Sequence, residues 1–118
     1  MARTALEVTA IAINGAVDTA ATGVYQAADA TDGLEIVFGE PERILLHVKN
    51  AGVADAEVTI KAGTYARSGL GAYAVTVPAS GESLIGPFES ARFEQPGDAL
   101  HIDFDVDTSV TVAAFKLP

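Results

Sequence analysis

Residues 43–61 read RILLHVKNAGVADAEVTIK, and this stretch has the most regular pattern in the chain. Apolar residues occupy every second position in both of its halves: Ile44, Leu46 and Val48, then Val58 and Ile60. A period of two is typical of a strand with one buried face. Between the halves, Asn50-Ala51-Gly52 supplies residue types that tolerate the positive φ angles of a tight connection. The stretch therefore predicts a β-hairpin that sets the register of the fold.

Six further segments have strand patterns, and turn signals separate them at intervals of roughly 8–12 residues. They are residues 4–13, 34–38, 73–77, 83–88, 100–105 and 110–115. Residues 89–95 fit either a short strand or a helical turn, and no amphipathic helix stands out. About eight short strands in one chain predict an all-β fold, a single antiparallel β-sandwich that is immunoglobulin-like or a jelly roll.

The first segment, Thr4–Ile13, contains an irregularity. Leu6 and Val8 share one face, whereas Ile11 and Ile13 have the opposite parity. A phase change near Thr9-Ala10 predicts a β-bulge or a strand that passes from one sheet to the other.

The length and composition of the chain limit the number of domains and the kinds of cross-link that it can have. The 118 residues fit one domain, residues 1–118, which at this size buries roughly two-thirds of its unfolded surface. The chain has no cysteine, so disulfides and thiolate metal sites are excluded. The predicted domain has two irregular parts besides its turns, a short N-terminal arm (1–4) and a long loop (14–33).

Charge and hydropathy argue against two classes of partner, nucleic acids and membranes. The chain has 16 acidic and 7 basic residues, a formal net charge of −9, which repels nucleic acid. Its apolar runs are shorter than the ~20 residues of a membrane span, so no membrane partner is expected. The N-terminus alternates in polarity where a signal peptide has an unbroken apolar block. These features predict a protein made in a cytoplasm and kept there, or built into an assembly there.

The motifs that could carry chemistry are incomplete. The run Asp103–Asp107 resembles the start of a calcium loop, but Thr108 and Ala114 stand where that loop needs glycine and glutamate. Adventitious or interface-completed calcium binding stays open, although alternate carboxylates fit the solvated side of a strand better. His47 and His101 have no third zinc ligand nearby in sequence. Ser68 lacks the strand-to-helix setting of a catalytic elbow. We therefore expect no enzyme, metal or cofactor.

Two loops are the candidate contact regions. Residues 63–72, GTYARSGLGA, contain Tyr65 and Arg67, residue types enriched at interface hot spots. Residues 14–33 form a connection unusually long for a compact domain. The alternatives are that Tyr65 covers the edge of the core and that the long loop has no role.

Four segments together resemble a known family. They are MARTALEVT (1–9), LLHVKNAG (45–52), VTVPASGESLIGPF (75–88) and LHIDFDVDTSVTVAAFKLP (100–118). In this order they resemble small β-sandwich virion structural proteins of tailed phages, especially phages of actinobacteria. The resemblance covers most of the chain and is weakest in the two loops.

The resemblance implies a non-enzymatic decoration protein bound to the outside of a capsid, with the major capsid protein as partner. It also implies a homo-oligomer, with a trimer at local threefold positions as one form. We expect three contact regions: the N-terminal residues Ala2, Arg3 and Thr4; Val24 with Tyr25; and Tyr65, Arg67 and Leu70. The alternatives are a tail or head–tail connector protein, and a carbohydrate- or calcium-dependent adhesion module.

Overall fold

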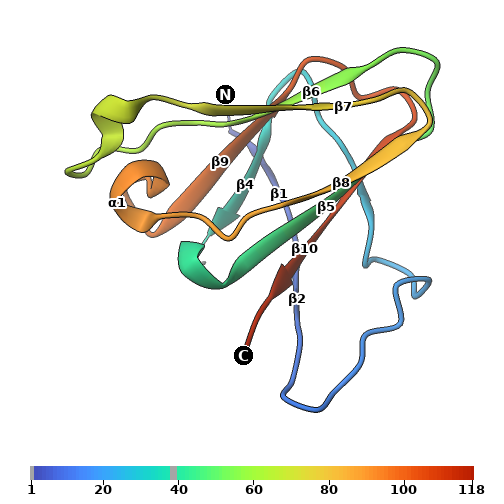
Figure 1. Ribbon diagram of the computed structural model, residues 1–118, viewed down its shortest axis with the longest axis horizontal. Coiled ribbons are helices and arrows are strands. Elements are labelled where there is room, and N and C mark those ends of the chain that lie inside the picture. Colours follow the sequence, from blue (N-terminus) through green and yellow to red (C-terminus); the bar gives the residue numbers. More distant parts are fainter. Residues whose placement is uncertain (1, 38–39) are drawn as a thin grey trace.

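The computed structural model describes residues 2–37 and 40–118, and strands dominate them (Figure 1). The strands are β1 (Thr4–Ala5), β2 (Val8–Ala10), β3 (Gln26–Ala27), β4 (Leu34–Val37), β5 (Ile44–Asn50), β6 (Ala56–Ile60), β7 (Tyr73–Val77), β8 (Gly81–Ile85), β9 (Ala99–Phe104) and β10 (Val110–Lys116). Sheet A has the order β1-β4-β9-β6-β7, and sheet B has the order β2-β10-β5-β8 with β3 also on β10. The all-β sandwich predicted from the sequence is confirmed.

The pairing of strands β3 to β10 distinguishes between the two sandwich types. β3 pairs with β10, β4 with β9, β5 with β8 and β6 with β7, all antiparallel. First with last and second with second-last is the pairing of a long hairpin rolled into two sheets, which is a jelly roll. Every connection among these eight strands except that from β6 to β7 passes from one sheet to the other.

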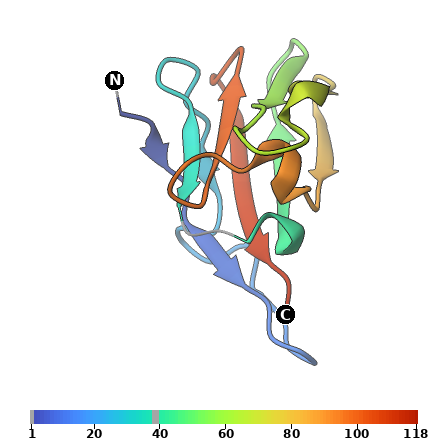
Figure 2. The ribbon, with the colours of Figure 1, turned by 90° about the vertical axis from the view of Figure 1, so that its left-hand side faces the viewer.

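The two N-terminal strands lie outside this antiparallel scheme. β1 pairs in parallel with β4 of sheet A, and β2 pairs in parallel with β10 of sheet B. Figure 2 shows the two strands following one another along one side of the molecule. The sheet-to-sheet passage expected from the phase change is therefore present, but it occurs at Leu6-Glu7. Leu6 is buried at this crossing, whereas Ile13 after β2 is 77% exposed, so the parity change near Thr9-Ala10 does not mark a second buried face.

The short N-terminal arm predicted over residues 1–4 is wrong for Thr4, and its Arg3 is bound to sheet A. Thr4 belongs to β1, and its N–H donates to the Gly33 carbonyl at 3.0 Å. Arg3 Nη1 donates to Asp103 Oδ1 at 2.6 Å, and its side chain is largely buried. Met1 lies outside the described residues. A cation with a carboxylate partner two strands away anchors this end of the chain to sheet A.

The predicted hairpin over residues 43–61 is also wrong, although both of its strands exist. β5 belongs to sheet B and β6 to sheet A, so the connection between them arches across the core. The alternation itself is correct, because Ile44, Leu46 and Val48 are buried on one strand and Val58 and Ile60 on the other. The two apolar faces point at each other across the sandwich instead of lying side by side.

The remaining segments agree with the sequence pattern in outline. Leu100, Ile102 and Phe104 of β9 are buried, as their alternation indicates. The ambiguous segment contains the one-turn helix α1 (Ser90–Phe93), and two 3₁₀ turns precede it, η1 (Pro41–Arg43) and η2 (Ser68–Leu70). The strand expected over 34–38 is β4, and Phe38 and Gly39 lie outside the described residues. Over the described ranges, no helix is long and apolar enough to cross a bilayer.

Candidate functional site

The outer face of sheet A is a charged surface. Ladder register places Glu35 opposite His101 and Thr59 opposite Asp103. Lys61 Nζ forms an ion pair with Asp103 Oδ2 at 3.9 Å, and His101 Nε2 lies 3.6 Å from Glu35 Oε2. Burial, and after it the nearby positive charge of Arg3, hold the pKa of His101 below its ordinary value. This face is therefore suited to contact with water.

The outer face of sheet B is different, because apolar side chains share it with polar ones. Register places Phe115 opposite Leu45, His47 opposite Leu84, and Lys49 opposite Glu82. Residues directly opposite in an antiparallel pair point to the same side of the sheet. The long loop covers part of this face. Leu84 is left 67% exposed beside it.

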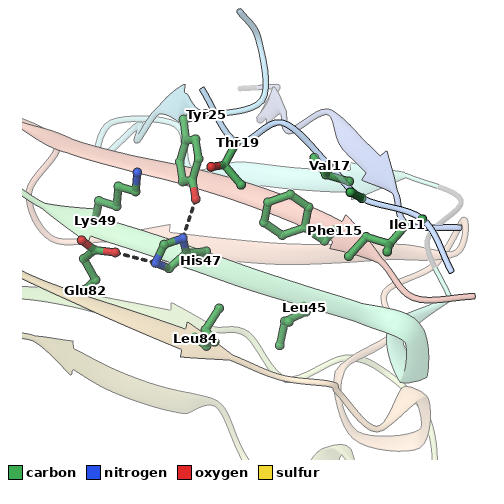
Figure 3. A pocket seen from close by; sticks show the side chains of 12 residues that line it. Ile11, Val17, Thr19, Tyr25, Leu45, His47, Lys49, Glu82, Leu84 and Phe115 are labelled. Carbon is green, nitrogen blue, oxygen red and sulfur yellow. Dashed lines mark hydrogen bonds and ion pairs between the residues drawn. The ribbon is translucent and has the colours of Figure 1, made fainter. Parts of the chain in front are cut away.

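A groove of about 580 Å³ lies between the long loop and this face of sheet B (Figure 3). Its lining residues are Ile11, Gly15, Ala16, Val17, Thr19, Tyr25, Leu45, His47, Lys49, Glu82, Leu84 and Phe115. Apolar side chains form one end and polar side chains the other, as Figure 3 shows. The volume is within the range of small-molecule and side-chain pockets.

The polar end is a connected network around His47. His47 Nε2 lies 2.8 Å from Glu82 Oε1, and the Tyr25 hydroxyl bonds to His47 Nδ1. If Nε2–H donates to the Glu82 carboxylate, Nδ1 is free to accept from Tyr25. Lys49 Nζ lies 4.0 Å from the centre of the Tyr25 ring, a cation–π contact. Three separate segments thus meet at one histidine.

The network holds the long loop against the sheet. Tyr25 directly precedes β3, whose Gln26 pairs with Val112 of β10. The hydroxyl contact to His47 adds a side-chain attachment at the point where the loop enters the sheet. The position of the loop, and with it one wall of the groove, therefore depends on Tyr25.

Tyr25→Phe should loosen this wall without unfolding the domain. The substitution removes the hydroxyl and leaves His47 Nδ1 without its partner, which costs about 1 kcal/mol. We expect faster hydrogen exchange over residues 14–25 and little change elsewhere. Tyr65→Phe makes the same chemical change at an exposed position and serves as the control. Equal exchange in the two variants would contradict the assigned attachment.

The loop of residues 63–72 presents a second exposed surface. Tyr65 and Leu70 are about half exposed, at 48% and 56%. Arg67 Nε donates to Glu89 Oε1 at 2.7 Å, and Arg92 Nε donates to the Gly71 carbonyl at 3.0 Å. Two arginines therefore connect the loop to the segment that contains α1, and the apolar side chains project from a fixed base.

The other predicted contact residues are dispersed. Ala2 is exposed, whereas Arg3 is engaged with Asp103 and Val24 is half-buried. Thr4 Oγ1 donates to Asp29 Oδ2 at 2.6 Å. Hydrogen bonds, first from the backbone N–H of Asp32 and then from Thr4, hold the pKa of Asp29 below its ordinary value.

The three predicted contact regions do not form one surface. β1 and β7 are opposite edges of sheet A, so the N-terminal residues lie far from the loop that leads into β7. Tyr25 belongs to the outer side of the other sheet. Sequence reasoning missed His47, Lys49, Glu82 and Leu84 as groove residues. The register of β5 with β8 and the return of the long loop bring these side chains together with Tyr25.

The acidic run near the end of β9 bonds to protein groups. Asp103 pairs with Arg3, Asp105 Oδ1 accepts from the Glu57 N–H at 2.7 Å, and Asp107 Oδ2 accepts from the Ala30 N–H at 3.0 Å. Within residues 2–37 and 40–118, no cluster of three or more histidine or carboxylate side chains is arranged to hold a metal ion.

Comparison of the chain with family models, with curated proteins and with solved structures gives no match.

Proposed function

We propose that the chain is a non-enzymatic structural protein of a phage virion, a decoration protein that binds the outer surface of the capsid as a homo-oligomer. The observation that carries the proposal is the contrast between the two outer faces of the sandwich. Sheet B combines apolar side chains with a groove, whereas the outer face of sheet A has charged side chains paired around Asp103 and uncharged small side chains on β7. A protein that coats a shell needs one face for docking and one for solvent.

The groove face has the composition of a docking surface. Leu84 and Leu45 lie at its apolar end, and Tyr25, His47 and Lys49 form a polar border. Protein interfaces commonly place apolar residues at the centre and polar residues around them. The formal net charge of −9 would keep the outward face of a bound copy hydrated and apart from the packaged DNA.

The proposed mechanism is mechanical. A copy that lies over the seam between two capsid subunits buries apolar area on both, so separating the subunits exposes more surface to water. Internal DNA pressure must then break additional contacts before the shell opens. A sandwich suits this task because its strands are joined by a continuous ladder and its core is closely packed.

Leu84→Glu should weaken binding to the shell. Burying one leucine side chain contributes about 1.5–3 kcal/mol, so we expect the dissociation constant to rise by about tenfold or more. The measurement is co-sedimentation with shells assembled without this chain. Val53→Glu is the matched control, since Val53 is fully exposed in the β5–β6 connection and lies outside the groove. Equal binding by the two variants would refute the docking face.

The earlier contact regions are tested in the same assay. Deleting residues 1–4, or replacing Tyr65 and Arg67, should weaken co-sedimentation if those regions also touch the shell. The deletion removes the Arg3–Asp103 ion pair, so its melting temperature has to be measured alongside. Tyr65 and Arg67 are exposed, but replacing Arg67 also removes its bond to Glu89, so the Tyr65 variant separates binding from folding more cleanly.

A tail or head–tail connector protein is the second candidate, and the unpaired outer side of β7 favours it. An exposed strand edge can accept a strand from a neighbouring protein. The position of the chain in a purified particle separates the two roles. Hundreds of copies over the shell support decoration, and a few copies at one vertex support the connector.

An adhesion module is the third candidate, and the polar end of the groove favours it. Tyr25, Lys49 and Glu82 provide donors and acceptors of the kind that bind sugar hydroxyls. Binding to a glycan array, or a melting temperature that rises with calcium, would support this role over decoration.

A further inference from the structure

The sandwich has two five-residue edge strands with different chemistry. Sheet A ends at β7 and sheet B ends at β8, and no further strand pairs with either in the described part of the chain (Figure 1). β8 contains Glu82, and Gly86 with a φ of 116° follows it directly. Charge and irregular backbone are devices that keep an edge from pairing with another chain. β8 is therefore a protected edge.

β7 lacks these devices. Its sequence is Tyr-Ala-Val-Thr-Val, with no charge, glycine or proline inside the strand. It pairs with β6 without a bulge, from Tyr73 opposite Ile60 to Val77 opposite Ala56. Tyrosine, valine and threonine are the residue types that favour strands. An uncharged and regular edge is a template for another strand, and β7 has these features.

We propose that β7 pairs antiparallel with β7 of a second copy of this chain, which joins the two A sheets across a two-fold axis at Val75. An isologous contact of this kind uses the same patch on both copies. The inference does not depend on the virion role. The dimer replaces the threefold assembly implied by the resemblance.

Side-chain parity selects the register. The side chains of β7 that point toward the interior of the sandwich are those of Tyr73, Val75 and Val77. Those on the outer face of sheet A are Ala74 and Thr76. Residues directly opposite must belong to the same face, because a shift by one residue would place apolar side chains against the wrong side. Pairing centred on Val75 satisfies this rule and overlaps all five residues.

The register also makes the strand complementary to itself. Tyr73 of each copy lies opposite Val77 of the other copy, and the two Val75 residues lie opposite each other. Aromatic with β-branched and β-branched with β-branched are favourable cross-strand pairs. Tyr73 is 46% exposed and Val75 half-buried in the single chain, so both have surface left to cover. An unrelated partner strand would need a matching sequence, whereas a second copy already has it.

Charge repulsion is small along this edge. Two acidic side chains lie beside it: Glu57 of β6 is opposite Thr76, and Asp55 Oδ1 accepts from the Ala79 N–H at 3.1 Å just beyond the end of β7. In the dimer two Glu57 residues lie three strand spacings apart, about 14 Å. This exceeds the screening length of about 8 Å at physiological ionic strength. The overall net charge of −9 still opposes association, so added salt should strengthen the dimer.

The first test is the mass of the purified chain in solution, by light scattering or sedimentation equilibrium over a range of concentrations. We expect a monomer–dimer equilibrium that shifts toward the dimer as protein or salt concentration rises. A monomer under all these conditions, or a mass of three chains, overturns the proposal.

Two double variants test the register. In the proposed pairing residue 74 is opposite residue 76 of the other copy. Ala74→Lys with Thr76→Lys sets like charges opposite each other and should abolish the dimer. Ala74→Glu with Thr76→Lys sets opposite charges there and should retain it. All these positions are exposed, and both variants should melt close to the parent. If both dimerise like the parent, or if both lose the dimer, the register is overturned.

Cross-linking gives an independent readout. The chain has no cysteine, so Val75→Cys introduces a single thiol. Directly opposite residues of an antiparallel pair have Cα atoms about 4.5–5.5 Å apart, a distance that a disulfide can span. We expect mild oxidation to link Val75→Cys into a covalent dimer much faster than Thr76→Cys, whose thiols are offset along the strands. Equal rates, or faster linkage of Thr76→Cys, contradict the two-fold axis at Val75.

Discussion

Gly63→Ala is expected to lower the free energy of unfolding by about 3 kcal/mol, because there is no room for a side chain at this position. A Cβ on Gly63 would overlap the Glu94 carbonyl oxygen and would lie 2.6 Å from its carbonyl carbon. The loop runs against the segment after α1 here, and the Gly63 N–H donates to the Arg92 carbonyl at 2.8 Å. Since the obstacle is backbone, relief requires moving the loop or α1.

Gly69→Ala is the matched control in the same loop. A Cβ on Gly69 meets nothing within 4 Å, and the residue has no positive φ. The change should be neutral or stabilising by less than about 1 kcal/mol, since alanine restricts the unfolded chain. Urea unfolding of both variants gives the comparison. If Gly63→Ala is as stable as Gly69→Ala, the close approach of the two backbones is wrong.

The loop of residues 63–72 is packed against the segment that contains α1. Gly63 permits backbone contact at one end, and Arg92 bonds to the Gly71 carbonyl at the other. Tyr65 and Leu70 therefore project from a loop attached at both ends. From sequence, the three glycines indicate mobility. In the structure one of them, Gly63, instead allows the loop to pack closely against the backbone of Glu94.

The strands could be predicted from the sequence because alternation reflects burial directly. A residue in every second position of β5, β6 or β9 faces the core, and the hydrophobic effect selects apolar side chains there. The all-β class and most strand positions follow from this one rule. The phase change in the first segment does not follow this rule, because the chain changes sheets before it, at Leu6-Glu7, and Ile13 after it is 77% exposed.

The partner of each strand could not be predicted in the same way. The alternation indicates which side of β5 is buried. It does not indicate whether β6 lies beside β5 in the same sheet or across the core in the other sheet. Both arrangements bury the same residues. The tight-turn residues at 50–52 favoured a hairpin, whereas the arch uses the same asparagine for a different purpose.

The groove was missed for a related reason. Tyr25, His47 and Glu82 are separated by more than twenty residues each, and no spacing motif connects them. Only the register of β5 with β8 and the return of the long loop bring them together. In the sequence His47 is a strand residue with no third zinc ligand nearby. In the fold it is the centre of a three-residue network.

The second large effect on stability is expected at Asn50, in the arch between the two sheets. Its side chain is 2% exposed and serves three backbone groups. Nδ2 donates to the Ala54 carbonyl at 2.8 Å and to the Val77 carbonyl at 3.2 Å, and Oδ1 accepts from the Gly52 N–H at 3.0 Å. One amide therefore closes the β5–β6 arch and attaches it to the end of β7.

Asn50→Ala should lower the free energy of unfolding by about 2–3 kcal/mol, because it leaves buried backbone groups without partners. Asn50→Asp should cost more than alanine although it has nearly the same shape. Aspartate keeps an oxygen that accepts from the Gly52 N–H. Its second oxygen replaces the amide NH₂ donor and, without a proton at neutral pH, faces the carbonyl oxygens of Ala54 and Val77 in a buried site.

Urea unfolding of the two variants at neutral pH, with hydrogen exchange at residues 50–56 and 77–80, checks this order. If aspartate is tolerated as well as asparagine, the amide does not donate to Ala54 and Val77. If both variants match the parent, the arch is stabilised by its apolar strands alone. The predicted order, parent above alanine above aspartate, requires that the residue which resembles a turn signal in the sequence acts as a hydrogen-bonded link between the sheets.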